Sequence, residues 1–447
     1  MVTQLANRVI AAARAHVADA TEPLGWFERE RFPELPSDAE VLQDMQARRL
    51  LLPECAEPKV SIIVPVYGKF ATTWNCLAAL AEIDAGVSFE VIVVDDCSPD
   101  CTRQMLSRVD NVRMIENASN LGYLRSNNRA AESARGRWLC LLNNDTRVTP
   151  RWLAELVNTF EAFPRVGLVG SKLLFADGRL QEAGGIVFAD ASCENYGRWA
   201  DPERPRYNFA RSVDYCSAAC VLLPRALWRD LGGFDEYFAP AYYEDTDLAF
   251  RVREAGFDVM YQPLSRVVHY HGVTHGKNPK HGLKRSLLVN RERFAQRWRP
   301  RLATHPSADD DVRASAERLQ VPGLLLCLPR SPDSARDAEL REYLDFARQV
   351  RHDGYHVSVA CECGMMGKAV RSELGRNGIE ICQESLPKLL RTRGQRFRAV
   401  MFVGAANAER ARAIVQRNAP WLSCLQRPPS LREWQEIAPF GSKQRAE

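Results

Sequence analysis

Three acidic residues stand out because each is expected at the end of a strand or the start of a helix. They are Asp96, Asp145 and Asp245, and they lie far apart along the chain. An Asp at a strand end is by default a turn former, so any one of them alone is better explained as a turn or a cap. Open α/β sheets bind ligands at the carboxyl ends of their strands. The set therefore predicts a cleft in which the three carboxylates converge.

The residues Asn143, Asn144 and Asp145 end an apolar run that begins at Trp138. A strand that ends in two amides and a carboxylate delivers hard oxygen ligands to the edge of a sheet. Such ligands suit Mg²⁺ or Mn²⁺ carrying a diphosphate. We therefore expect Asp145 to hold a divalent ion and the ion to hold a nucleotide-sugar. The alternative is an Asx turn, which Thr146 also favours.

The other two acids have separate expected roles. Asp96 follows a buried strand, so its carboxylate can accept hydrogen bonds from a base or a ribose. Glu244 and Asp245 open a helix, whose positive end is expected to keep Asp245 ionised and therefore a weak general base. A weak base suffices if the sugar–phosphate bond is largely broken before the acceptor hydroxyl loses its proton. Helix capping is the alternative for both Asp96 and Asp245.

Histidines and aromatic residues extend the candidate site. His269 lies beside a strand end and could complete the metal site through a ring nitrogen. A zinc site built from later histidines with Cys216 or Cys220 is a weaker alternative, because the spacing matches no usual zinc pattern. Three aromatic side chains could stack on sugar faces, although such residues more often belong to a core. The later histidines are His271, His275 and His281, and the aromatic residues are Trp199, Tyr242 and Tyr243.

Continuous apolar strands that alternate with helices surround Asp96 and Asp145. This rhythm predicts a parallel sheet with both faces covered. A dinucleotide-binding unit would place a G-x-G-x-x-G turn after the first strand, but only Gly68 follows there. A metal ion on Asp145 is therefore the expected counter-charge for a diphosphate. The expected strands are 60–67, 89–94, 112–115, 138–142, 166–170, 213–223, 259–261 and 267–272, with 171–212 expected to be irregular.

Length and composition bound the rest of the molecule. The 447 residues predict two or three domains: an N-terminal helical arm (1–58), an α/β domain (59–300), a linker (301–321) and a smaller Rossmann-like α/β domain (322–447). The net charge of +4 does not favour nucleic acid as a partner. The thirteen cysteines are expected to be reduced and the protein cytoplasmic, because no signal peptide precedes them. No apolar run reaches the roughly 20 residues of a membrane span.

At this point the chain resembles the inverting glycosyltransferases of family 2, which have the GT-A fold. The resemblance implies that Asp145 is a metal ligand, that Asp245 is the catalytic base with Glu244 beside it, and that His269 is a further metal ligand or phosphate contact. The matching pieces are Pro65 to Tyr67, Val93 to Ser98, Asn120 to Tyr123, Leu142 to Thr146, Gly232 to Asp235, Tyr243 to Leu248, and His269 with Gly272.

The same resemblance implies two sets of binding residues. Asn143 stands where the family's D-x-D motif has its first Asp, which removes one charge, and the Asn-Asn-Asp branch is most similar to rhamnosyltransferases of surface polysaccharide assembly. A UDP- or dTDP-linked sugar would contact Pro65, Val66, Tyr67, Asp95, Asp96, Asn120, Gly122, Asn128, Asn143 and Asn144. A glycan or lipid-linked glycan acceptor would contact Trp199, Ala218, Ala219 and Tyr243.

The expected function is metal-dependent transfer of a sugar with inversion, in the cytoplasm or at the inner face of the membrane. Residues 322–447 resemble the front half of the N-terminal domain of a GT-B glycosyltransferase, without the half that binds the nucleotide-sugar. Two alternatives stay open. One is a non-catalytic subunit that binds a nucleotide-sugar, and the other is a nucleotidyltransferase, which would need a Gly-rich basic loop where residues 65–71 have none.

Overall fold

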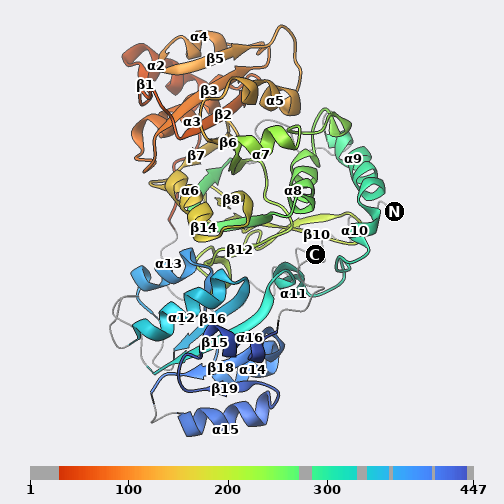
Figure 1. The fold of residues 1–447 in the computed structure, drawn as a ribbon. Coiled ribbons are helices and arrows are strands. Elements are labelled where there is room, and N and C mark those ends of the chain that lie inside the picture. The colour runs from red at the N-terminus through yellow and green to blue at the C-terminus, as the bar shows by residue number, and fades with distance from the viewer. Residues whose placement is uncertain (1–29, 271–283, 330–339, 362–365, 405–407, 440–447) are drawn as a thin grey trace. The chain divides into compact units, whose positions relative to one another are not determined.

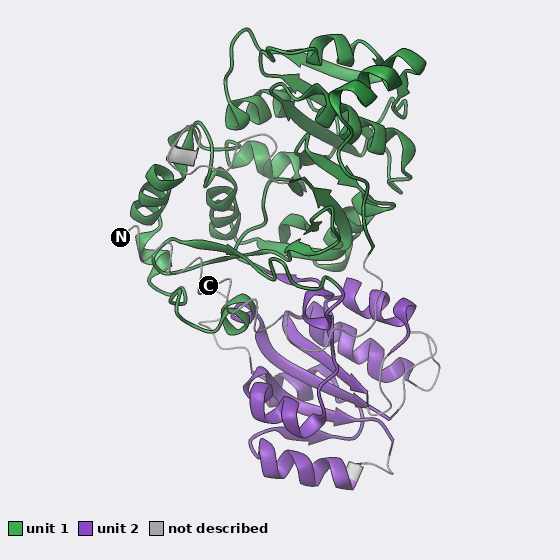
Figure 2. Cartoon of the chain, turned by 180° about the vertical axis from the view of Figure 1, so that it is seen from behind, with its two compact units in different colours: residues 1–202, 213–316 green, residues 203–212, 317–447 purple. Residues whose placement is uncertain are grey.

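The computed structural model describes residues 30–270, 284–329, 340–361, 366–404 and 408–439. The chain divides into two compact units (Figure 2). Unit 1 comprises residues 1–202 and 213–316, and unit 2 comprises residues 203–212 and 317–447. All the candidate site residues named above that the structure describes belong to unit 1. The histidines at 271, 275 and 281 and residues 1–29 of the expected N-terminal arm lie outside the described residues.

Unit 1 is built on a mixed, mostly parallel sheet whose strands run in the order β14-β8-β13-β6-β2-β3-β5 (Figure 1). The first four strands in sequence pair in parallel, as their apolar runs predict, and β13 is inserted antiparallel between β6 and β8. These strands are β2 (Val60–Val66), β3 (Phe89–Asp95), β5 (Val112–Glu116), β6 (Trp138–Leu142), β8 (Val166–Leu174), β13 (Cys220–Pro224) and β14 (Asp258–His269).

Helices cover both faces of this sheet, which confirms the predicted fold class. α5 packs on β2 and β3, α6 packs on β8 and β14, and α8 packs on the same pair. The helices of unit 1 are α2 (Asp38–Ala47), α3 (Phe70–Glu82), α4 (Thr102–Leu106), α5 (Tyr123–Ser133), α6 (Trp152–Ala162), α7 (Arg225–Asp230), η2 (Glu236–Phe238), α8 (Glu244–Glu254), α9 (Lys284–Arg297), α10 (Arg299–Leu302) and α11 (Val312–Glu317), the last residue of which opens unit 2.

Two sequence expectations for this region are wrong. Residues 171–212 are not irregular, because β8 continues to Leu174 and several short strands follow it. The expected strand 213–223 begins only at Cys220, and residues 217–219 form a turn instead. The minor strands are β1 (Leu50–Leu51), β4 (Val109–Asp110), β7 (Thr146–Val148), β9 (Leu180–Glu182), β10 (Gly185–Val187) and β11 (Cys193–Asn195).

Unit 2 contains a parallel sheet in the order β17-β16-β15-β18-β19, so the first strand lies in the middle and the chain winds outward on both sides. Alternate residues of β15 enter different cores: Leu324 and Leu326 pack in one, and Leu325 in the other. This is the doubly wound arrangement expected for 322–447. Its elements are β15 (Val321–Leu328), α12 (Arg341–His352), β16 (Tyr355–Cys361), α13 (Lys368–Arg376), β17 (Ile379–Cys382), α14 (Leu386–Arg393), η3 (Gly394–Arg396), β18 (Phe397–Phe402), α15 (Ala408–Asn418), β19 (Ser423–Leu425) and α16 (Leu431–Ile437).

Unit 2 also includes residues 203–212, which leave unit 1 and return to it. This segment contains η1 (Pro205–Tyr207) and β12 (Arg211–Ser212). The Ala210 N–H donates to the Gly375 carbonyl oxygen (2.8 Å), and the Phe209 ring lies edge-on to His356. Among the described residues, every helix is too short or too polar to cross a membrane.

Candidate active site

Asp145 and His269 lie side by side because β7 pairs antiparallel with the end of β14. This register puts His269 opposite Thr146, the residue after Asp145. The Tyr270 N–H also donates to the Asp145 carbonyl oxygen (2.9 Å). The Nε2 atom of His269 is 3.1 Å from Oδ1 of Asp145, and both side chains are almost buried. The two residues expected to bind the metal ion are therefore neighbours.

Gln181 determines which nitrogen of the His269 ring faces Asp145. Its Oε1 atom is 2.8 Å from His269 Nδ1, while its Nε2 faces the His269 carbonyl oxygen at 3.5 Å. An amide oxygen can only accept, so Nδ1 carries the proton of this hydrogen bond. Nε2 then turns its lone pair or a second proton toward the Asp145 carboxylate. The Asp145 carboxylate and the Nε2 edge of the His269 ring therefore face each other.

This pair fits a divalent metal ion. Octahedral coordination at about 2.1 Å places neighbouring ligand atoms about 3 Å apart, which matches the Asp145–His269 separation of 3.1 Å. Within the described ranges, no group of three His, Cys, Asp or Glu side chains is arranged to hold a metal ion. Asp145 and His269 could thus supply two ligand atoms to such an ion, and oxygen atoms from outside these two side chains would complete its coordination.

Asn143 adds an unused oxygen to the same strand end. Its N–H donates to the Ala219 carbonyl oxygen (3.0 Å), and its own carbonyl oxygen accepts from Thr146 Oγ1 (2.7 Å). Its side-chain Oδ1 is buried and has no hydrogen-bond partner. Asn144 differs, because its amide donates to Thr73 Oγ1 in the interior (2.9 Å). Asn143 and Asp145 are therefore the two members of the motif whose side chains remain at the site.

Asp96 organises the loop that precedes α5. Its Oδ1 accepts hydrogen bonds from Asn117 Nδ2 and Leu121 N (both 2.7 Å), and its Oδ2 accepts from Gly122 N (2.8 Å). Gly122 adopts a φ of 85°, which favours glycine. The expected role of Asp96 was to contact a base or ribose. In the structure its carboxylate holds the backbone that presents Tyr123.

The turn at residues 217–219 connects all three acidic positions. Ala218 N donates to Asp245 Oδ2 (3.2 Å), and Ala218 O accepts from the hydroxyl of Tyr123 (2.9 Å), the residue after Gly122. Ala219 O accepts from Asn143 N, two residues before Asp145. Burial, followed by the charges of Glu244, Asp245 and Asp145, raises the pKa of Tyr123. The charges of Glu244, Asp245 and Asp145 therefore all act on the Tyr123 phenol, and the turn at 217–219 is hydrogen-bonded to both Tyr123 and Asp245.

Asp245 is a stronger base than the sequence predicted. Burial raises its pKa, against the opposing effect of the hydrogen bonds from the N–H groups of Ala218 and Thr246. The expectation that the helix N-terminus leaves Asp245 a weak base is thus wrong, because removal from water outweighs the helix. Burial, together with the Asp245 charge, raises the pKa of Glu244 to about 8. One oxygen of Glu244, Oε2, is buried without a hydrogen-bond partner.

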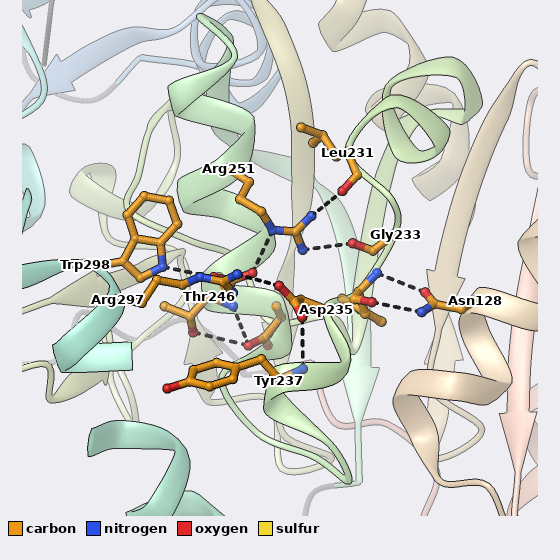
Figure 3. Close-up of polar contacts among 12 residues, drawn as sticks. Asn128, Leu231, Gly233, Asp235, Tyr237, Thr246, Arg251, Arg297 and Trp298 are labelled. Atoms are coloured by element: carbon orange, nitrogen blue, oxygen red, sulfur yellow. Dashed lines mark hydrogen bonds and ion pairs between the residues drawn. The ribbon is translucent and has the colours of Figure 1, made fainter. Parts of the chain in front are cut away.

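The first turn of α8, which carries Asp245, is held by a buried charge cluster (Figure 3). Asp247 is fully buried and accepts hydrogen bonds from Arg251 Nε (2.7 Å), Arg297 Nη1 (3.1 Å) and Trp298 Nε1 (2.9 Å). Arg251 also donates to the carbonyl oxygens of Leu231 and Gly233 (both 2.8 Å). These contacts tie α8 to α9 and to the preceding turn, so the position of Asp245 depends on them.

Several other sequence-predicted residues are engaged elsewhere. Asn128 uses both ends of its amide on the backbone of Phe234, and the Tyr243 hydroxyl donates to Ala191 O (2.7 Å). Trp199 stacks on Phe175 at 4.0 Å, with two guanidinium groups near its ring. Pro65 and Val66 are buried in β2, Asp95 accepts from Ser98 N, Tyr67 and Asn120 are exposed, and Tyr242 is half-buried.

Three further residues at the site were missed by sequence reasoning: Tyr123, Gln181 and Glu182. Gln181 and Glu182 lie on β9, inside the stretch expected to be irregular. Glu182 is buried, its Oε1 accepts from Ser217 N (2.9 Å), and burial raises its pKa to about 7. A three-residue strand shows no periodicity, so no sequence signal pointed to either residue.

Part of unit 1 is similar in sequence to known proteins. Residues 61–228 match the sequence profile of glycosyl transferase family 2. Over 233 residues the chain is 33% identical to an O-antigen biosynthesis protein of Myxococcus xanthus, a match of 50% of this chain and 18% of that protein. It is 28% identical over 237 residues to an N-acetylglucosaminyl-diphospho-decaprenol L-rhamnosyltransferase of Mycobacterium tuberculosis, a match of 47% of this chain and 76% of that enzyme.

A solved structure of GalNAc-T7 with UDP, GalNAc and Mn²⁺ is similar at a TM-score of 0.44 and 14% identity, over 62% of this chain and 60% of that one. The chain spans less than a fifth of the Myxococcus protein. The matched segment carries Asp96, Asp145 and β9, while α8 and His269 follow it. Residues 61–228 are therefore a glycosyltransferase family 2 domain.

Proposed function

We propose that this chain transfers a sugar from a nucleotide diphosphate to an acceptor hydroxyl with inversion, using a divalent metal ion. The arrangement of Asp145, His269 and Asp245 is the observation that supports this proposal most. Asp145 and His269 have potential ligand atoms 3.1 Å apart. The third is a carboxylate of raised pKa, linked to that pair through the turn at 217–219.

The donor side is the edge formed by β2, β3 and β6. Asp145 and His269 would hold Mg²⁺ or Mn²⁺, and the unpartnered Oδ1 of Asn143 would face the nucleotide or the ion. The ion supplies positive charge that stabilises the departing diphosphate. The exposed Tyr67 at the end of β2 is available to a uracil or thymine base, so a UDP- or dTDP-linked sugar is the proposed donor.

The acceptor side is the start of α8. As the acceptor oxygen attacks the anomeric carbon, its proton passes to Asp245 and a new C–O bond forms. The bond from the anomeric carbon to the diphosphate breaks on the opposite face, and the diphosphate leaves with the electron pair. A raised pKa suits Asp245 for this task, because a stronger base accepts the proton earlier along the reaction.

The acceptor proposed is a glycan or a lipid-linked glycan of a surface polysaccharide. The relatives named above are an O-antigen biosynthesis protein and a rhamnosyltransferase that acts on a diphospho-decaprenol carrier, by their names. This supports a polysaccharide pathway, with the protein in the cytoplasm or at the inner face of the membrane.

The test uses purified full-length protein with UDP- and dTDP-sugars, Mn²⁺ and a panel of glycan acceptors, and measures release of nucleoside diphosphate. We expect transfer to fall by about 10²–10⁴-fold in Asp245→Asn, the usual worth of a general base. Donor binding, read as a thermal shift with Mn²⁺, should be unchanged in that variant. Donor binding without any turnover would support a non-catalytic subunit instead, and pyrophosphate as the product would support a nucleotidyltransferase.

A further inference from the structure

The short strand β9 lies where the metal pair and the catalytic base meet. It pairs antiparallel with β8, the neighbour of β14 in the sheet. Two of its three residues, Gln181 and Glu182, carry buried polar side chains. Successive side chains of a strand leave on opposite sides, so these neighbours can serve two different partners. One contacts His269 and the other contacts the turn at 217–219.

Gln181 acts on the metal side. Its Oε1 accepts the Nδ1 proton of His269 at 2.8 Å, and its amide group also faces the His269 carbonyl oxygen. This contact holds the ring with Nε2 toward Asp145, 3.1 Å away. Groups that accept a proton from a ligating histidine fix its tautomer and orientation, and their loss typically costs 10–100-fold in metal affinity.

Glu182 contacts the turn at 217–219, which is hydrogen-bonded to Asp245. It accepts the N–H of Ser217, and the next N–H in the chain, that of Ala218, donates to Asp245. Two consecutive backbone N–H groups therefore hold two carboxyl groups from different elements. The other oxygen of Glu182 is buried without a hydrogen-bond partner. The charged and titratable groups that interact with Glu182 are Asp245 from α8, His269 from β14, and Arg198 and Tyr215 from the intervening segments.

We propose that β9 is a positioning strand, in which Gln181 orients His269 for the metal ion and Glu182 holds the backbone that supports Asp245. The proposal rests on the glycosyltransferase function above and adds two residues to it. It makes the two neighbours separable: substitution of Gln181 affects metal binding, and substitution of Glu182 affects the base.

The first arm of the test titrates Mn²⁺ into the full-length protein, with and without UDP, and follows free Mn²⁺ by electron paramagnetic resonance. Gln181→Leu should raise the dissociation constant for Mn²⁺ by about 10–100-fold. Gln181→Glu, which still accepts the Nδ1 proton, should stay within a few-fold of wild type. Gln181→Asn retains the amide but shortens its reach by one methylene. Gln181→Asn should weaken Mn²⁺ binding as Gln181→Leu does. It provides the same measurement if Gln181→Leu does not fold. Unchanged Mn²⁺ affinity in both Gln181→Leu and Gln181→Asn would overturn the metal half of the proposal.

The second arm measures backbone hydrogen exchange at residues 217–219 by mass spectrometry, together with kcat and the donor KM. Glu182→Ala should speed exchange in this turn and lower kcat by about 10–100-fold, with little change in the donor KM. Glu182→Gln keeps an acceptor for Ser217 N and should restore both readings. Glu161→Ala, at an exposed position on α6, is the control. An equal loss of kcat in Glu182→Gln and Glu182→Ala would contradict a role for Glu182 through its hydrogen bond with Ser217 N.

The two arms cross-check each other. Glu182→Ala should leave the Mn²⁺ affinity unchanged, and an equal fall in affinity in Glu182→Ala and Gln181→Leu would show general loss of structure instead of two positioning roles. Neither Mn²⁺ titration nor hydrogen exchange needs turnover. If the wild-type protein transfers no sugar, the proposed function fails while these two readings still decide the role of β9.

Discussion

At the scale of single residues, the site is defined by what burial does to its carboxyl groups. Asp96 has hydrogen-bond donors on both oxygens and serves the loop before α5. Asp245 has donors but its pKa is still raised, and Glu244 beside it has one oxygen without any partner. Three acids that are alike in sequence therefore have different surroundings: Asp96 is bonded to the loop before α5, Asp145 faces His269, and Asp245 has a raised pKa.

Glu244 should make stability depend on pH. Its pKa is raised from the ordinary 4.5 to about 8 in the folded protein, so the folded state keeps a proton that the unfolded state loses. The contribution of Glu244 is fully present below about pH 4.5 and is lost as the pH rises toward about 8. The Tm of wild type should therefore fall relative to that of Glu244→Gln across this window. Glu254→Gln, at the exposed end of α8, should show the same dependence of Tm on pH as wild type. If Glu244→Gln also showed the same dependence as wild type, Glu244 would not be the group whose pKa is raised.

Asn143 should be convertible into a stronger metal ligand. Asn143→Asp places a carboxylate where an uncharged, unpartnered oxygen now lies, and we expect Mn²⁺ affinity to rise by about tenfold or more. Mn²⁺ titration monitored by paramagnetic resonance measures this. Asn144→Asp is the matched control, because that side chain is bonded to Thr73 in the interior. A gain in the control equal to that in Asn143→Asp would mean that the location of the charge does not matter.

At the scale of elements, the start of α8 is held in place by groups distant in sequence. Tyr242 and Tyr243 both adopt positive φ values just before the helix, and the buried amide of Asn290 on α9 donates to the carbonyl oxygens of Ala241 and Tyr242. Non-glycine residues hold such conformations only where the surroundings enforce them. The turn and α9 together thus determine where Asp245 points.

Arg251→Met should test this anchoring. It removes three hydrogen bonds and one of the two arginines that pair with the fully buried Asp247. Loss of one partner of a buried pair costs about 3–5 kcal/mol of unfolding free energy, which chemical denaturation can measure, and we expect kcat to fall with it. Arg229→Met, on the exposed face of α7, should change stability by less than about 0.5 kcal/mol. Equal effects of the two substitutions would show that the cluster does not anchor α8.

At the scale of the whole molecule, the chain crosses between its units more than once. Residues 203–212 belong to unit 2 although unit 1 supplies the sequence on both sides of them. Their backbone bonds to α13 through Ala210 and Gly375, and Gly375 lies so close to Asn208 that a Cβ there would be 2.1 Å from the Asn208 carbonyl oxygen. Unit 2 is thus completed by a segment that a simple C-terminal boundary would omit.

Gly375→Val should therefore loosen the segment 203–212. The side chain would collide with backbone, so we expect a lower Tm and faster proteolytic cleavage within 203–212 than in wild type. Gly367→Ala is the control, since a Cβ at Gly367 meets nothing within 4 Å. Limited proteolysis with mass spectrometry locates the cut. Cleavage confined to other parts of the chain would contradict the assignment of this segment to unit 2.

The sequence by itself determined the strands of the parallel sheet, because continuous apolar runs such as 60–66 and 138–142 can only be buried. It also singled out Asp96, Asp145, Asp245 and His269, since strand and helix ends can be located from the same runs. Only the tertiary structure decided what surrounds each of them. The base strength of Asp245, the use of His269 and the presence of Glu182 depend on burial and on hydrogen bonds from segments far along the chain, which no local pattern encodes.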